Sequence, residues 1–188
     1  MYSYSIPTTK KVLREKLRTQ LTNQGKNIHP HVGVLFDSLN RLLDTLAVNA
    51  LGGYFPLRGE PDLSVLLDAW IQKGVRCLYP RIQGKKMSYA WITPGTYTLK
   101  DSYNCLVGEN LAPEVPDAII VPFLGYTRTG YRLGRGGGFI DRYLVANPHV
   151  IAIGVGYASQ EISMTVEPHD KRLAYVVTDQ ETLSFYPH

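Results

Sequence analysis

The chain has 188 residues, of which 44% are hydrophobic and 19% charged, and its formal net charge is +4. This composition fits one globular domain over residues 1–188, and we see neither internal repeats nor low-complexity tracts. No apolar run reaches the roughly 18 residues of a membrane span, and the N-terminal segment lacks the apolar core of a secretory signal, so we expect a cytoplasmic protein. The charge is too modest to require nucleic acid, for which a dense basic stripe is typical. Cys77 and Cys105 lack metal-ligand spacing, and we expect reduced core thiols.

Two helices are expected first. Thr8 or Thr9 can cap the first helix, and residues 32–46 follow the i, i+3, i+4, i+7 pattern of an amphipathic second helix. The first helix has an apolar stripe of Leu13, Leu17 and Leu21, and its other faces carry Lys10, Lys11, Arg14, Lys16 and Arg18. A solvated surface and a phosphate contact are both consistent with such a basic helix.

Strands and helices alternate along the rest of the chain. Asp62 can cap a helix that stops at Gly74, and another helix is expected over residues 139–146. Residues 93–116 form a long, turn-rich segment of a kind that is often functional. Apolar runs predict strands at 50–57, 75–80, 86–92, 117–122, 150–157 and 173–179. The alternation predicts an α/β fold with a mainly parallel central sheet flanked by helices.

The stretch "GYRLGRGGGFIDRYL" at residues 130–144 follows the strand at 117–122, on the edge of the sheet where such folds bind ligands. It is neither a P-loop nor a complete dinucleotide fingerprint. Arg132 and Arg135 are planar donors that suit phosphate oxygens. Four glycines allow backbone N–H groups to approach an anion at the start of the next helix: Gly134, Gly136, Gly137 and Gly138. The stretch therefore indicates phosphate binding, or else a structural glycine turn with solvent-facing arginines.

Three acids accompany this stretch. Asp141 opens the following helix, where it can complement the helix dipole, and Asp170 lies in a turn after Pro168, where aspartates often cap. Since Mg²⁺ prefers one or two carboxylates together with substrate phosphates, Asp141 and Asp170 can instead form a magnesium site. Glu60 follows another strand end, either as a solvated loop residue or as an acceptor for the amines of a substrate. We expect His169 to be a surface or packing residue.

In chain order, these residues resemble the 5-formyltetrahydrofolate cyclo-ligase family, whose enzyme is also called methenyltetrahydrofolate synthetase. The shared elements are "K-x-x-x-R" in the first helix, "E-x-D" before the third, "YPRI", "P-x-L-G-Y", "G-x-R-L-G-R-G-G-G-F-x-D-R-Y", "VEPHDKR" and "VVTD". The resemblance runs from about Lys10 to Thr178. Its most specific part is "FLGYTRTGYRLGRGGGFIDRYL" at residues 123–144.

The resemblance implies a compact α/β domain related to sugar-phosphate-isomerase-like sheets. It also implies conversion of 5-formyltetrahydrofolate to 5,10-methenyltetrahydrofolate with ATP and magnesium: the formyl oxygen attacks the γ-phosphate, N10 closes the ring, and phosphate leaves. Arg132 and Arg135 are implied to act catalytically around the transferred group. The implied ATP-binding residues are Lys10, Arg14, Arg132, Gly134, Arg135, Gly136, Gly137 and Gly138, the folate-binding residues are Phe55, Glu60, Tyr103 and Phe139, and the magnesium ligands are Asp141 and Asp170.

The chain departs from the family pattern mainly around the folate. Phe139 and Ile140 stand where the family commonly has two tyrosines, Leu63 replaces a usual threonine, and the loop at 104–116 lacks a "G-I-x-E-P" element. A first alternative is therefore an ATP-binding relative that acts on another substrate, and a second is a basic module that binds nucleic acid. Under the main hypothesis we expect a monomer that acts on a small molecule and binds neither nucleic acid nor a membrane.

Overall fold

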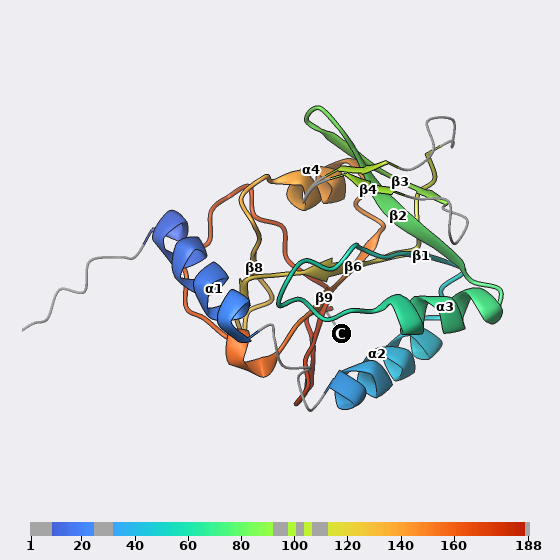
Figure 1. Cartoon of the computed structure of the whole chain (residues 1–188), viewed down its shortest axis with the longest axis horizontal. Coiled ribbons are helices and arrows are strands. Elements are labelled where there is room, and N and C mark those ends of the chain that lie inside the picture. The colour runs from blue at the N-terminus through green and yellow to red at the C-terminus, as the bar shows by residue number, and fades with distance from the viewer. Residues whose placement is uncertain (1–8, 25–31, 92–97, 101–103, 107–112, 187–188) are drawn as a thin grey trace, which may run out of the picture.

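The computed structural model describes residues 9–24, 32–91, 98–100, 104–106 and 113–186. A seven-stranded sheet forms its centre, with the strand order β11-β10-β9-β6-β1-β2-β3 (Figure 1). Antiparallel β3 (Lys86–Trp91) and β11 (Thr182–Ser184) are the two edges. The five strands between them are parallel: β1 (Ala50–Gly52), β2 (Arg76–Gln83), β6 (Ala118–Pro122), β9 (Ile151–Val155) and β10 (Tyr175–Val177). The predicted α/β fold with a mainly parallel central sheet is confirmed.

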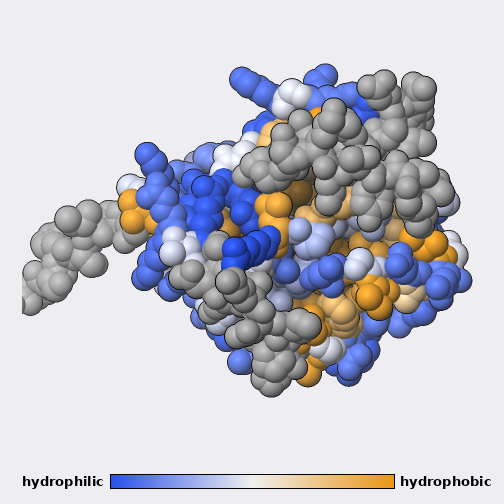
Figure 2. All heavy atoms as spheres, viewed as in Figure 1, coloured by the Kyte–Doolittle hydropathy of each residue, from blue (hydrophilic) through white to orange (hydrophobic). Residues whose placement is uncertain are grey.

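Helices cover both faces of this sheet. Helices α2 (Val32–Leu46) and α3 (Ser64–Gln72) lie on one face and α4 (Phe139–Ala146) on the other, while α1 (Lys10–Gln24) lies to one side (Figure 1). One hydrophobic cluster joins α2 and α3 to the sheet, and a second joins α4 to it. Apolar side chains reach the surface over α2 and α3, whereas hydrophilic side chains gather between α1 and the centre of the molecule (Figure 2).

Strand β6 shows why its sequence is uniformly apolar. Ala118 and Ile120 belong to the cluster with α2 and α3, whereas Ile119 and Val121 belong to the cluster with α4. All four side chains are at most 1% exposed. Because successive residues of a strand face opposite sides, a central strand that is covered on both faces needs apolar residues at every position.

Helix α1 packs through the narrow leucine stripe that its sequence predicts. Leu17 and Leu21 are buried in a small cluster with Leu124 and Leu133. Leu124 directly precedes β7 (Gly125–Tyr126), and Leu133 lies in β8 (Arg132–Leu133), which pairs with β7 in a hairpin. The packing therefore holds α1 against the segment that leads into the glycine stretch.

Helices α1 and α3 begin near the expected caps. The Thr9 hydroxyl accepts the N–H of Val12 at 3.5 Å, and Thr8 lies outside the described residues. The Asp62 carboxylate accepts the N–H of Ser64 at 3.0 Å, from one position before the cap of α3. Side-chain oxygens at helix starts satisfy N–H groups that have no partner inside the helix.

Short strands are where the sequence prediction was incomplete. Expected strand 50–57 ends at Gly52, and expected strand 75–80 continues to Gln83 because it pairs with β3 in a hairpin. The structure adds β4 (Thr98–Lys100), β5 (Asn104–Leu106), β7, β8, β11 and the 3₁₀ helix η1 (Ala158–Gln160). Elements of two or three residues are too short to show a hydrophobic period.

The cysteine prediction is confirmed where it can be followed. Cys77 is a free, buried thiol, and burial raises its pKa to about 12, with a smaller contribution from the charge of Asp68. The side chain of Cys105 lies outside the described part of the chain. Within the described ranges, no helix combines the length and the apolar character that crossing a bilayer requires.

Candidate active site

A cavity of about 260 Å³ lies beside the carboxyl end of β6, where the fold class predicts a ligand site. Most of the predicted site residues line it: Lys10, Arg14, Glu60, Arg132, Gly134, Arg135, Gly136, Gly137, Gly138, Phe139, Asp141 and Asp170. Phe55 is not in this lining and instead stacks on Tyr79 with ring centroids 4.6 Å apart. Tyr103 lies outside the described residues. The structure thus brings the phosphate and magnesium candidates together more completely than the folate candidates.

The glycine stretch is held by its carbonyl oxygens. Arginines of α1 and α4 donate to them: Arg14 to Gly134 (3.0 Å), Arg18 to Arg135 (2.6 Å) and Arg142 to Gly137 (2.9 Å). In the described parts of the chain, the N–H groups of residues 134–138 donate to no protein acceptor. Gly136 and Gly138 have φ values of +102° and +63°, a backbone region that favours glycine. These residues therefore present consecutive N–H groups to solvent or to a ligand.

Arg132 is a buried cation that joins three segments. Its side chain is 4% exposed, and its Nη2 lies 3.0 Å from Asp141 Oδ1. Its Nη1 donates to the carbonyl oxygen of Lys171 at 3.0 Å, and the Lys171 N–H donates to the same Asp141 oxygen at 3.0 Å. Burial lowers the pKa of Arg132, and the negative charges of Asp141 and Asp170 offset only part of this effect. The guanidinium thus connects β8, α4 and the turn at 167–171.

Arg135 pairs with Glu60, another of the acids that the sequence predicts for this site. Its Nε and Nη2 donate to Glu60 Oε1 at 3.0 and 2.7 Å, while Glu60 Oε2 accepts the N–H of Leu57 at 2.9 Å. The Glu60 side chain is only 4% exposed, so the solvated-loop interpretation of Glu60 is wrong. Burial raises the pKa of Glu60, opposed by the charge of Arg135 and by its hydrogen bonds.

Arg132 and Arg135 do not face the solvent, as they would in the alternative of a structural glycine turn. The Arg132 side chain is 4% exposed and that of Arg135 is 24% exposed, and both lie against the cavity. A guanidinium carries five N–H donors in a fixed plane, and Arg135 donates two of them to Glu60. Donors therefore remain for an anion.

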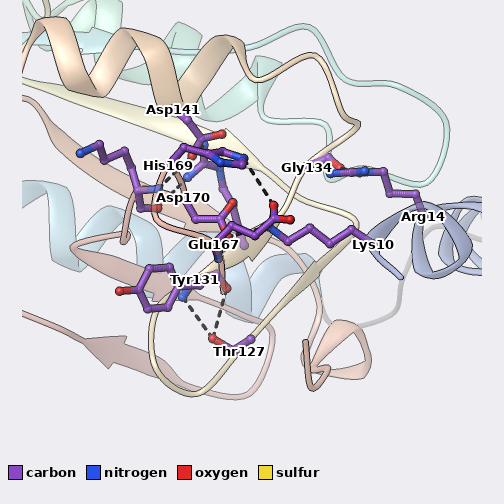
Figure 3. Close-up of polar contacts among 11 residues, drawn as sticks. Lys10, Arg14, Thr127, Tyr131, Gly134, Asp141, Glu167, His169 and Asp170 are labelled. Carbon is purple, nitrogen blue, oxygen red and sulfur yellow. Dashed lines mark hydrogen bonds and ion pairs between the residues drawn. The ribbon is translucent and has the colours of Figure 1, made fainter. Parts of the chain in front are cut away.

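Lys10 reaches from the first turn of α1 to the turn at 167–170 (Figure 3). Its Nζ lies 2.6 Å from both Glu167 Oε2 and Asp170 Oδ2. Burial of Lys10 acts to lower its pKa, but the hydrogen bonds and charges of Asp170 and Glu167 prevail and raise it. The His169 side chain is 74% exposed, as expected of a surface residue, with Nε2 3.4 Å from Glu167 Oε2.

The sequence interpretation missed the apolar wall of the cavity. Pro80 and Ile82 on β2 and Met87 and Tyr89 on β3 face it. Each pair has the i, i+2 spacing that places two side chains on one face of a strand, and this was the available signal. The role of Glu167 as a partner of Lys10 was also missed, because contacts between residues so far apart in the chain leave no local pattern.

We predict that Arg132→Met lowers the free energy of unfolding by about 3 kcal/mol, because breaking a buried ion pair leaves Asp141 without its cation. Urea denaturation followed by circular dichroism measures the change. Arg128→Met is the matched control, since the exposed Arg128 pairs with Glu161 and Glu181 at the surface, and its midpoint should stay near that of the wild type. Equal midpoints for the two variants would contradict the structural role of Arg132.

A second prediction concerns pH. Because the pKa of Glu60 is raised in the folded protein, the native state retains this proton at pH values where the unfolded chain has lost it. Stability contributed by this carboxyl is therefore present at low pH and is lost as the pH rises through the folded pKa. As the pH rises from about 4, near the usual pKa of glutamate, the unfolding free energy of the wild type should fall relative to that of Glu60→Gln. If the unfolding free energy of the wild type instead rose with pH relative to that of Glu60→Gln, the raised pKa assigned to Glu60 would be wrong.

Comparisons with known proteins agree on one family. The sequence model of the 5-formyltetrahydrofolate cyclo-ligase family matches residues 7–179. A 5-formyltetrahydrofolate cyclo-ligase of Mycolicibacterium smegmatis is 33% identical over 143 residues, covering 66% of this chain and 71% of that protein. The solution structure of 5,10-methenyltetrahydrofolate synthetase from Aquifex aeolicus matches with a TM-score of 0.80 and 24% identity, over 96% of this chain and 95% of that one. A Mycoplasma pneumoniae 5,10-methenyltetrahydrofolate synthetase matches with a TM-score of 0.71 and 18% identity, over 92% of this chain and 99% of that one. These structural likenesses show the fold, and the sequence matches show that the chain belongs to the 5-formyltetrahydrofolate cyclo-ligase family.

Proposed function

We propose that the protein converts 5-formyltetrahydrofolate to 5,10-methenyltetrahydrofolate and consumes ATP in the process, with ADP and phosphate as the other products. Family membership supports the reaction. The observation that carries the proposal is the cavity, in which the open N–H groups of the glycine stretch and four cationic side chains meet an apolar wall. The cytoplasmic location and the monomeric state stay predictions.

The phosphate end of the proposed site is formed by the glycine stretch and its surroundings. Lys10, Arg14 and Arg135 line the cavity beside residues 134–138. Charge-assisted donors such as guanidinium groups bind phosphate oxygens about twice as strongly as neutral donors do. The α4 helix begins directly after the stretch, so its positive end favours an anion at the same place. This end suits the triphosphate of ATP.

Asp141 and Asp170 fit a magnesium ion by their donor atoms. The hydrogen bonds of Asp141 all end on Oδ1 and those of Asp170 on Oδ2, so within the described residues each acid keeps one oxygen without a protein donor. Both acids line the cavity, and the negative charges of both act on the guanidinium of Arg132. Magnesium bound there would neutralise phosphate charge, which is the chemistry that a hard cation held by oxygen ligands supplies.

The folate end is formed by the apolar wall and Glu60. Ile82, Met87, Phe139 and Ile140 offer apolar surface of the kind that accepts a flat ring system. Glu60 is the buried acceptor at this end, and its carboxylate can receive substrate amines while it holds Arg135. Phe139 and Ile140 carry no hydroxyl group, so orientation of the ring by tyrosine donors is lost here.

The chemistry follows from the weakness of the formyl carbon as an electrophile. Attack of the formyl oxygen on the γ-phosphorus of ATP forms an O–P bond and releases ADP, which turns that oxygen into part of a leaving group. N10 then adds to the formyl carbon and loses its proton, and the C–O bond breaks with release of phosphate. Arg132 fixes Asp141, while Arg135, Lys10 and the N–H groups orient the phosphate and neutralise its charge, which is most of what phosphoryl transfer requires.

A relative that uses ATP on another substrate is the second candidate. Ile140 favours it, because this residue packs against the core cluster below α4 and offers no polar group to the ring that the family binds. Both candidates share the phosphate end. They differ only in what occupies the apolar end.

The first test is the folate reaction itself. Purified protein with 5-formyltetrahydrofolate, ATP and Mg²⁺ should produce the near-ultraviolet absorbance of the methenyl product. The rise should be lost when ATP is omitted or when Mg²⁺ is chelated. Clear ATP binding without any rise would support the second candidate instead.

We also predict that Arg135→Lys raises the KM for ATP about tenfold, the size expected from losing a hydrogen bond to a charged group. Lysine keeps the positive charge opposite Glu60 but lacks the planar fork that binds two phosphate oxygens. Initial rates at varied ATP measure the effect, and Arg128→Lys, outside the cavity, is the control. An unchanged KM would remove Arg135 from the phosphate site.

A further inference from the structure

Glu167 lies next to the cavity but has no part in the proposed reaction. Its Oε2 is 2.6 Å from the Nζ of Lys10, and its side chain is 47% exposed. Glu167, His169 and Asp170 present ligand atoms within 4.8 Å of one another, and Lys10 already contacts both acids. Within this cluster, the ammonium of Lys10 is therefore the positive charge that the two carboxylates share.

Lysine needs such anchors more than arginine does. Its charge sits at the end of a flexible four-carbon stem without the pre-organised planar fork of arginine, so that more rotamer entropy is lost for each hydrogen bond formed. Lys10 is the first residue of α1, and its side chain reaches away from the helix to the turn at 167–170. Two carboxylates that meet the same Nζ at 2.6 Å restrict the ammonium to one place at the wall of the cavity.

The two anchors differ in what else they do. Asp170 also accepts the N–H of Glu167 at 2.7 Å, and under the proposed function it is a magnesium ligand. A divalent cation bound by Asp170 would repel the ammonium of Lys10 and would weaken its attraction to this carboxylate. Among the described residues, the Glu167 carboxylate contacts only Lys10 and, at a longer 3.4 Å, His169. It is the anchor that remains available when Asp170 is engaged.

We propose that Glu167 is a positioning residue, which holds the ammonium of Lys10 where it contacts the phosphates of ATP while Asp170 serves the metal. The inference rests on the proposed function in two respects, namely that Lys10 binds nucleotide phosphates and that Asp170 binds the metal. Glu167 is not part of the cavity lining, and it acts through Lys10.

The test is a double-mutant cycle on ATP binding, measured by calorimetry with Mg²⁺ and without folate. Glu167→Gln should raise the Kd for ATP about two- to fivefold, the range of a partly exposed ion pair. Lys10→Met should raise it further, and adding Glu167→Gln to Lys10→Met should change nothing more. Interaction between residues in contact appears as such non-additivity. In the folate assay, Glu167→Gln should raise the KM for ATP and leave kcat within about twofold, as expected of a lost binding contact.

Glu181→Gln is the matched control, because it removes an acid from an arginine pair away from the cavity and should leave the Kd unchanged. Glu167→Asp keeps the charge and should fall between the wild type and Glu167→Gln. An equal effect of Glu167→Gln with and without Lys10 would overturn the inference, as would an unchanged Kd. A wild-type protein that binds ATP but forms no methenyl product would refute the folate reaction alone, whereas one that binds no ATP would refute both.

Discussion

The buried guanidinium of Arg132 is the constraint on which the site depends. A cation that is 4% exposed has to be paired, and here the partners are Asp141 and a backbone carbonyl of the turn at 167–171. The same pairing fixes the start of α4 relative to β8 and brings that turn to the edge of the cavity. Asp170 and Glu167 lie in this turn and hold Lys10 of α1. One buried charge thus organises groups from four separate segments.

Acidic side chains of the chain itself balance most of the cations that line the cavity. Arg132 is balanced by Asp141, Arg135 by Glu60, and Lys10 by Asp170 and Glu167. Arg14 donates instead to a carbonyl oxygen. Under the proposed function, an incoming phosphate would therefore meet donors that are already oriented, which would reduce the rearrangement needed on binding. The acids that orient the cations also include both candidate magnesium ligands.

The central sheet and its layers could be predicted from the sequence because they rest on long apolar runs. The five residues of β6 and the leucines of α2 each repeat a pattern that one element carries alone. The glycine stretch could be singled out as part of a candidate site because its residue types are unusual together, and it does line the cavity. The pairing of Arg135 with Glu60 could not, since 75 residues separate them and only the tertiary fold brings them together. The β7–β8 hairpin, with two residues in each strand, left no period to detect.

The attachment of α1 has a consequence for the order in which the molecule is made. The polar contacts that attach it to other described segments are distant in the chain: Arg14 and Arg18 bind residues 120 and 117 positions later, and Lys10 binds residues 157 and 160 positions later. During synthesis α1 leaves the ribosome well before these partners do. Helix α1 is therefore among the last of the described segments to reach its final position, and a nascent chain that stops before the turn at 167–170 has no complete pocket.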